Sequence, residues 1–152
     1  MRKYLVTAAV LALSVTATPA FADANGDLKA LVDSYWADVL KEAPIFASSL
    51  GIDTYARDVG DYSLAASDRR ASTAALFLKK LQAIPEAELD AASKVEAGIL
   101  ARSLNSTIEG NRFGQRAINF TTYSSWHQSF AGMANNLPFK SKADFESYNA
   151  RL

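Results

Sequence analysis

The sequence predicts an all-α protein, an irregular bundle of four to six helices. Apolar residues recur three and four positions apart along several segments, which is typical of helices with one buried face. Serine, aspartate, proline and glycine stand near the ends of these segments, where helices begin and end. Strand and helix patterns do not alternate along the sequence, so a nucleotide-binding sheet is not predicted. With 152 residues, of which 49% are hydrophobic, the chain is long enough to bury a core.

The first 22 residues have the three parts of a cleaved export leader. Arg2 and Lys3 are positive, residues 4–15 are uncharged, and Ala20-Phe21-Ala22 matches the A-x-A cleavage pattern. Polar residues and Pro19 interrupt the stretch, whereas a membrane span needs about 20 predominantly apolar residues. We therefore expect cleavage after Ala22. The mature region, residues 23–152, is then soluble in the periplasm or secreted, and is no longer attached to the membrane.

The clearest helix is predicted over residues 27–42. One face of it is apolar, with Leu28, Leu31, Val32, Tyr35, Trp36, Val39 and Leu40. Asn25 or Asp27 can cap its start. Pro44 ends it, because a proline disfavours helical geometry in the residue before it.

A second, short helix follows, running from Pro44 to Leu50. Proline suits the first turn of a helix, and Gly51 can supply the left-handed conformation that often ends one. Residues 52–62 then lose the periodicity and have the composition of a loop.

The third helix is predicted to begin after Ser63 or Ser67 and to run to about Ala83. Its apolar stripe is mostly alanine, which suits close approach of a neighbouring helix: Leu64, Ala71, Ala74, Ala75, Leu78 and Leu81. We expect the charged residues to face water: Asp68, Arg69, Arg70, Lys79 and Lys80.

Two further helices are predicted before residue 138. The first ends near Gly110 and carries Val95, Ile99, Leu100, Leu104 and Ile108 on its apolar face. Gly98 inside it costs about 1 kcal/mol relative to alanine unless a close packing contact compensates. Residues 111–125 have an irregular pattern that allows a short extended segment. The next helix follows Ser124 or Ser125 and is marked by Trp126, Phe130, Met133 and Leu137.

A last helix begins with a capping-box pattern, in which Asp144 follows Ser141 by three residues. Phe145, Tyr148 and Leu152 form its apolar face. The sequence stops there after about three turns, which is shorter than a helix can sustain without packing. We therefore expect the chain to be a fragment of a larger, mostly helical protein.

The composition and the motifs exclude several kinds of chemistry. The 16 basic and 16 acidic residues balance, so no basic field favours nucleic acid, and without cysteine there are no disulfides or thiolate sites. A histidine-based zinc site needs two histidines on one helix, but His127 is the single histidine. We expect it at a helix surface or in a contact with a partner. No nucleophile elbow or glycine-rich phosphate loop occurs. We therefore assign no catalytic, cofactor-binding or metal-binding residue within this chain.

The loop of residues 52–62 raises two possibilities for binding. Asp53, Asp58 and Asp61 supply oxygen ligands, but their spacing does not match the helix-loop-helix calcium pattern, and Arg57 lies among them. We therefore expect a hydrated loop that neutralises its own charge. Three tyrosines in predicted loops are the candidates for a ligand-facing surface: Tyr55, Tyr62 and Tyr123.

The order of short motifs resembles a bacterial family. Tyr35-Trp36, Pro44, Ala47-Ser48, Leu50-Gly51 and Tyr55 are followed by Asp61 and Ser63 at the start of a helix. The later motifs are Pro138-Phe139, Asp144-Phe145, Tyr148 and Arg151-Leu152. Together they are similar to exported proteins that contain the "domain of unknown function 885".

This resemblance implies a mostly helical parent protein, several times longer, that is similar to zinc-dependent metallopeptidases of the gluzincin clan. In such a parent, two histidines and a glutamate far downstream would hold zinc, and the glutamate of H-E-x-x-H would act as general base in peptide hydrolysis. None of those positions matches a residue here. The partner of this chain would be the missing C-terminal catalytic portion, and the chain alone would be inactive.

Two functions therefore remain open from the sequence. The first is the N-terminal helical part of an exported metallopeptidase-like protein that acts on peptides. The alternative is a complete small helical periplasmic protein, without catalysis, that binds a ligand or partner through residues 52–62 and 111–125. The two differ in what the gene encodes after codon 152.

Overall fold

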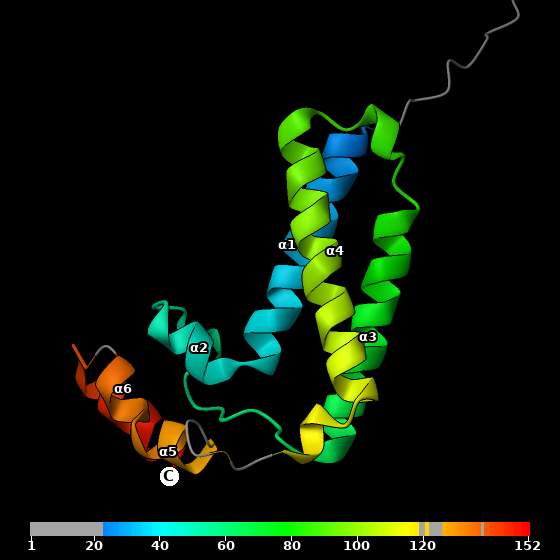
Figure 1. The fold of residues 1–152 in the computed structure, drawn as a ribbon. Helices are drawn as coiled ribbons and strands as arrows, with labels where there is room; N and C mark the ends of the chain where they lie inside the picture. Colours follow the sequence, from blue (N-terminus) through cyan, green and yellow to red (C-terminus); the bar gives the residue numbers. More distant parts are fainter. Residues whose placement is uncertain (1–22, 119–120, 122–125, 138) are drawn as a thin grey trace, which may run out of the picture.

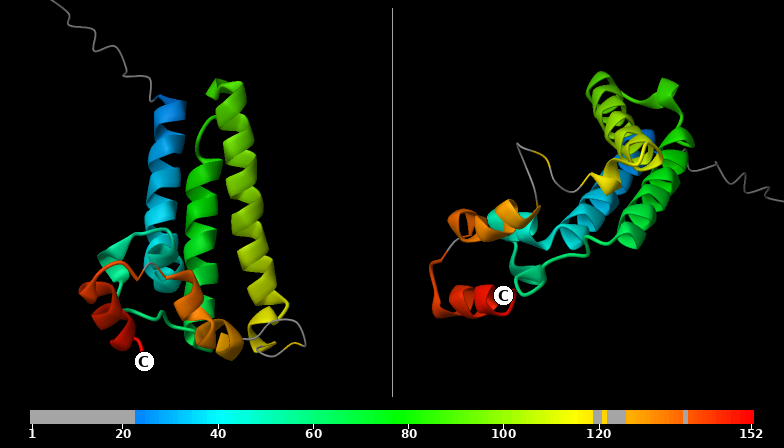
Figure 2. Two further views of the ribbon diagram at one scale, coloured as in Figure 1. Left: turned by 90° about the vertical axis from the view of Figure 1, so that its left-hand side faces the viewer. Right: turned by 60° about the horizontal axis from the view of Figure 1, so that its bottom comes forward.

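The computed structural model describes residues 23–118, 121, 126–137 and 139–152, and in these ranges it contains helices and no strand. Three long helices lie side by side: α1 (Ala24–Glu42), α3 (Leu64–Gln82) and α4 (Ala91–Arg112). Consecutive long helices run in opposite directions (Figure 1). The short α-helices α2 (Pro44–Ser49), α5 (Trp126–Ala131) and α6 (Lys142–Asn149) lie at the end of this bundle where α1 ends and α3 begins (Figure 2). The all-α prediction is confirmed, whereas the predicted leader lies outside the described residues.

The start of α1 differs from the prediction by one turn. Asp23 is the N-cap, and its carboxylate accepts a hydrogen bond of 3.2 Å from the backbone N–H of Asn25. The side chain of Asn25 instead accepts a bond of 3.1 Å from the backbone N–H of Asp90. Asn25 therefore joins the start of α1 to the start of α4, and the predicted caps Asn25 and Asp27 are wrong.

The predicted turn after α1 is confirmed. Helix α2 (Pro44–Ser49) begins with proline, and Gly51 has a φ of 79°, in the left-handed region. The loop that follows contains a short 3-10 helix, η1 (Asp53–Tyr55). It returns the chain to the start of α3.

Helix α3 begins after Ser63, whose hydroxyl accepts a bond of 3.1 Å from the backbone N–H of Ala66. Ser67, the alternative cap, donates a bond of 3.0 Å to Asn111 of α4. The predicted apolar stripe is partly wrong, because Leu64 and Ala75 are exposed while Phe77 is buried. Helix α3 packs against both α1 and α4, so the face it buries is set by two neighbours.

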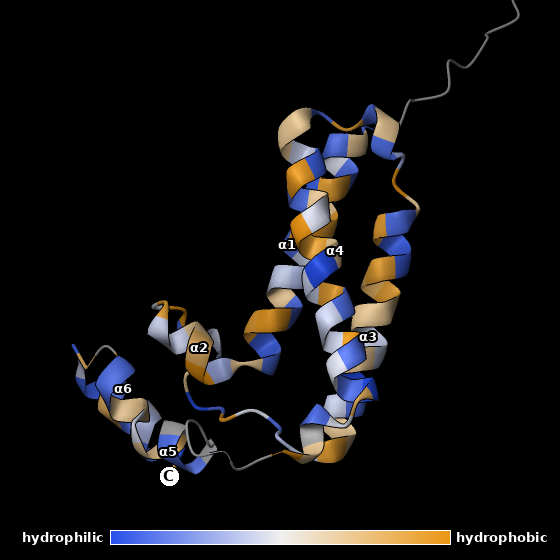
Figure 3. Cartoon of the chain, viewed as in Figure 1, coloured by the Kyte–Doolittle hydropathy of each residue, from blue (hydrophilic) through white to orange (hydrophobic). Residues whose placement is uncertain are grey.

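Helix α4 starts after a short 3-10 helix, η2 (Glu86–Glu88), and runs to Arg112, about half a turn beyond the predicted end. Its buried residues are Leu100 and Leu104. Val95 and Ile99, which were expected on the buried face, are 63% and 66% exposed. The long helices share one core, made of Ala24, Leu28, Leu31, Ala74, Phe77, Leu81, Leu89, Leu100 and Leu104. Figure 3 shows apolar residues, in orange, along the long helices of the bundle.

The predicted helix over residues 126–137 is divided in two. Helix α5 (Trp126–Ala131) is followed at Gly132 by a 3-10 helix, η4 (Met133–Asn136), in which Met133 is buried. Another 3-10 helix, η3 (Gln115–Ala117), follows α4. The possible extended segment was based on Ile118, Phe120 and Tyr123, and most of it lies outside the described residues. The predicted caps Ser124 and Ser125 lie outside the described residues.

Helix α6 (Lys142–Asn149) has the predicted capping box at Ser141 and Asp144. Its apolar face is partly covered, because Phe139 stacks on Phe145 at 4.7 Å and contacts Tyr148 edge-on at 5.4 Å. Phe145 and Leu152 remain 54% and 74% exposed. Among the residues that the structure describes, no helix has both the length and the apolar character needed to cross a membrane.

Arg151, directly after α6, is buried and fastens this helix to the α2 region. Its guanidinium donates to the hydroxyl of Ser48 at 2.7 Å and to the backbone carbonyls of Asp58, Tyr55 and Pro44 at 2.9, 3.1 and 3.3 Å. Burial lowers the pKa of Arg151 below its usual value, and the nearby negative charge of Asp58 offsets only part of this effect. A single side chain thus joins segments about a hundred residues apart in the chain.

Candidate functional site

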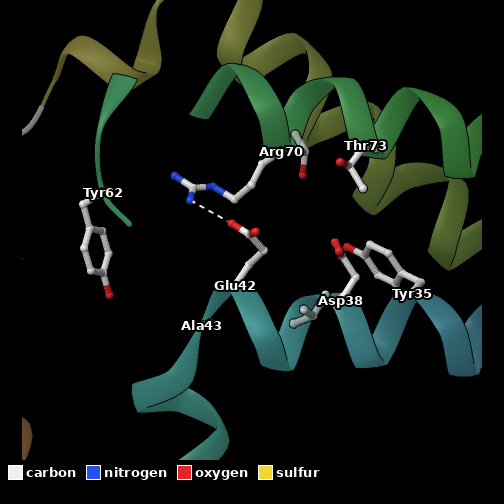
Figure 4. A pocket seen from close by; sticks show the side chains of 10 residues that line it. Tyr35, Asp38, Glu42, Ala43, Tyr62, Arg70 and Thr73 are labelled. Carbon is white, nitrogen blue, oxygen red and sulfur yellow. Dashed lines mark hydrogen bonds and ion pairs between the residues drawn. The ribbon is translucent and has the colours of Figure 1, made fainter. Parts of the chain in front are cut away.

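The candidate site is a pocket of about 360 Å³ between α1 and α3. Asp38 and Glu42 are four residues apart on α1 and therefore lie one above the other on the same face. Arg70 and Thr73 extend from the facing side of α3, and Tyr62 stands at one end of the pocket (Figure 4). Thr107 of α4 completes the lining. Three helices and one loop therefore contribute polar side chains to one hollow.

Glu42 is neutralised by two arginines of α3. Its Oε2 lies 3.2 Å from Nη2 of Arg69 and 3.3 Å from Nη1 of Arg70. Nη1 of Arg70 also donates a bond of 2.8 Å to the backbone carbonyl of Asp61. These contacts join the end of α1 to α3 and to the loop before it. They also correct the expectation that Arg69 and Arg70 would only face water.

Asp38 has a different environment from Glu42. It is half-buried, and its carboxylate makes no hydrogen bond or ion pair with any residue that the structure describes. Burial raises the pKa of Asp38, and the negative charge of Glu42 raises it further, while Lys41 and Arg69 oppose these effects more weakly. The pocket thus contains one carboxylate with two cationic neighbours and one with no direct partner.

The remaining wall combines an aromatic ring with hydroxyl groups. Tyr35 contacts Phe77 edge-on at 5.4 Å, and its hydroxyl shares a hydrogen bond of 3.3 Å with the hydroxyl of Ser103. The hydroxyl of Thr107 donates to the backbone carbonyl of Ser103 at 3.2 Å. Tyr35 is therefore held by Phe77 of α3 and by Ser103 of α4.

Of the three predicted ligand-facing tyrosines, the structure describes Tyr55 and Tyr62. Tyr62 is 63% exposed and lines both this pocket and a second, mainly apolar hollow of about 640 Å³. Tyr55 is half-buried in η1, where its backbone carbonyl accepts a bond from Arg151. Tyr123 lies outside the described residues. Of the three, Tyr62 contributes to the candidate site.

One of the acidic loop residues, Asp61, has a cationic neighbour other than the expected Arg57. Hydrogen bonds from Ser63 lower the pKa of Asp61, whose carboxylate lies 3.7 Å from Arg69, so the cation near it is Arg69 rather than Arg57. Asp53 is exposed. Within the described ranges, no three histidine, cysteine, aspartate or glutamate side chains are grouped so that they could hold a metal ion. His127 is exposed on α5, as predicted for a histidine at a helix surface.

Four residues of the pocket were not predicted from the sequence: Asp38, Glu42, Arg70 and Thr73. One signal was available, because two carboxylates four residues apart on a helix repel each other unless a cation lies near. The spacing could not reveal which cation, because Arg70 lies 28 residues after Glu42. Tyr35 was assigned to the apolar face of its helix, and it does pack there while its hydroxyl borders the pocket.

Comparison with known families matches residues 44–152 to a family described as "Bacterial protein of unknown function (DUF885)". The chain belongs to this family. The DUF885 match spans α2 to α6, whereas Tyr35, Asp38 and Glu42 precede the matched range. No curated protein and no solved structure matches the chain significantly. The resemblance read from the order of short motifs is therefore confirmed at the level of the DUF885 family.

Proposed function

We propose that this chain supplies the N-terminal helical part of an exported, zinc-dependent metallopeptidase-like protein that hydrolyses peptides. The observation that carries the proposal is the DUF885 match over residues 44–152. The zinc-peptidase part of the proposal rests on the resemblance to gluzincin-clan enzymes that the order of the sequence motifs implies. The leader pattern in residues 1–22 supports export to the periplasm or beyond.

The described residues offer no fit for zinc, because they contain no suitable group of ligands. In this proposal the ion and its general base belong to the rest of the parent protein, and this chain provides helices beside the catalytic groove. Exposed apolar side chains suit such packing against further helices: Val95 and Ile99 on α4, and Phe145 and Leu152 at α6.

The experiment is to read the gene past codon 152, express the whole reading frame and assay peptide cleavage with and without a zinc chelator. We expect several hundred further codons that include H-E-x-x-H, and cleavage that the chelator abolishes. A matched variant with the motif glutamate changed to glutamine should retain zinc and lose activity. A stop directly after codon 152, or zinc-dependent cleavage by residues 1–152 alone, would overturn the proposal.

The second candidate function is a small periplasmic binding protein without catalysis. The position of Tyr62 favours it, because this exposed ring borders two separate hollows next to the 52–62 loop. A stop directly after codon 152 would support it, and so would saturable ligand binding that Tyr62→Ala abolishes without loss of helix content.

A further inference from the structure

The α1–α3 pocket has the size and wall chemistry of a small-ligand site. Its volume of about 360 Å³ falls at the lower end of the range for ligand pockets, about 300–1,000 Å³. Val39, Ala43 and Ala74 give it an apolar lining, into which a few polar groups project. Such a combination favours a ligand with a short apolar body and one polar head.

The charge of the pocket determines which polar head fits. Arg70 is already bound to Glu42 and to the carbonyl of Asp61, so an anion would have to compete for an occupied guanidinium. Asp38 is half-buried and has no hydrogen-bond donor or ion-pair partner among the described residues. A carboxylate in this position is stabilised most by a cation that also donates hydrogen bonds.

The groups around Asp38 suit an ammonium ion in particular. Thr73, half-buried on the opposite helix, lines the same hollow, so its hydroxyl can accept a second N–H bond. The rings of Tyr35 and Tyr62 border the pocket on different sides, and aromatic faces attract organic cations. A divalent metal is disfavoured, because Asp38 is the one carboxylate here that is not already paired with arginine.

We propose that the α1–α3 pocket binds a small organic cation with a primary ammonium group, the chemistry of a free peptide amino end or an alkylamine, through the carboxylate of Asp38. The site lies mostly on α1 and α3 of this chain. It therefore stands whether or not a longer parent protein cleaves peptides.

The test uses the full 152-residue chain and the probe n-butylammonium chloride, with n-butanol as the neutral probe of similar shape. Calorimetry gives the affinity, and NMR shifts locate the contact. We expect saturable binding of n-butylammonium that shifts Thr73 and Tyr35 resonances, and weaker binding of n-butanol. Asp38→Asn should reduce the affinity by about tenfold or more, which corresponds to about 1.4 kcal/mol. The matched control Asp33→Asn removes an exposed carboxylate of the same helix and should leave binding unchanged.

Equal affinity for the charged and neutral probes, or equal losses in the two variants, would overturn the inference. Shifts confined to the hollow near Phe46 and Val59 would also overturn it, because they would place the ligand elsewhere. Circular dichroism checks that D38N is folded. If it were not, the comparison of the two probes on the unaltered chain would still decide the question. Absence of peptidase activity in a longer parent would leave all of these results as they are.

Discussion

The guanidinium of Arg151 donates a hydrogen bond of 2.7 Å to the hydroxyl of Ser48, which lies 103 residues earlier in the chain. The same guanidinium donates to three backbone carbonyls of residues 44–58. Hydrogen bonds to charged groups stabilise more than neutral ones, and their removal leaves buried acceptors without a donor. The contact between α6 and the α2 region therefore depends strongly on this one side chain.

Arg151→Ala should lower the free energy of unfolding by about 2 kcal/mol or more, because the four acceptors lose their shared donor. Urea unfolding followed by circular dichroism measures this loss. Arg102→Ala is the matched control, since the Arg102 side chain is exposed on α4 and makes no hydrogen bond or ion pair with a described residue. Equal stabilities of the two variants would show that the Arg151 contacts contribute nothing net.

Asp38→Asn should raise stability at neutral pH, because the folded state raises the pKa of this carboxyl and its ionised form is disfavoured there. Ionised Asp38 destabilises the folded state by its full amount at a pH above the folded-state pKa. This destabilisation disappears as the pH falls below 3.8, the usual pKa of an aspartate carboxyl. Thermal unfolding from neutral pH to about pH 3 checks this, with D33N as the reference for removing an exposed carboxylate. If D38N were more stable than the unaltered chain by the same amount at neutral and at acid pH, the electrostatic explanation would be wrong.

Asp144→Asn should have the opposite pH dependence. Backbone N–H groups of Lys140 and Ser141 donate to the Asp144 carboxylate and lower its pKa. A lowered pKa contributes stability above the usual carboxyl value of 3.8, and this stability is lost as the pH falls through the folded-state pKa. D144N should therefore be less stable than the unaltered chain at neutral pH, with a difference that vanishes in acid. Glu146→Gln, at an exposed position of the same helix, is the control.

Gly98→Ala should raise the free energy of unfolding by about 1 kcal/mol, the difference between the two residues in a helix interior. A Cβ at this position would meet no atom within 4 Å, so the structure supplies no close contact that requires glycine. Gly114→Ala serves as the contrasting variant, because its φ of 73° is unfavourable for alanine and stability should fall. Destabilisation by G98A would mean that another surface approaches α4 at this glycine.

Local signals in the sequence were enough to predict most helix boundaries. Pro44, Gly51, Ser63 and the Ser141–Asp144 pair act through neighbouring backbone groups, so their effects are visible within a few residues. The exception at α1 is instructive, because Asn25 could cap the helix and instead binds the backbone of residue 90. A long-range contact decided between two locally equivalent caps.

The buried face of α3 and the candidate site depend on which helices meet. Phe77 and Leu64 are both apolar, and only the positions of α1 and α4 make the first buried and the second exposed. The pair of Arg70 with Glu42 likewise forms across two helices, and Arg151 reaches backbone carbonyls that no side-chain pattern encodes. Periodicity could indicate the helices but not the partners of these charged groups.

The hydrogen bond from Arg151 to the carbonyl of Pro44 also has a mechanical consequence. Pro44 is the first residue of the DUF885 match and Arg151 is its penultimate one, so the two ends of the matched segment are pinned to each other. Tension applied across those ends would load the hydrogen bonds of the Arg151 guanidinium before it reached the helices between them. We therefore expect these hydrogen bonds to break before the helices of the bundle unfold when the segment is stretched.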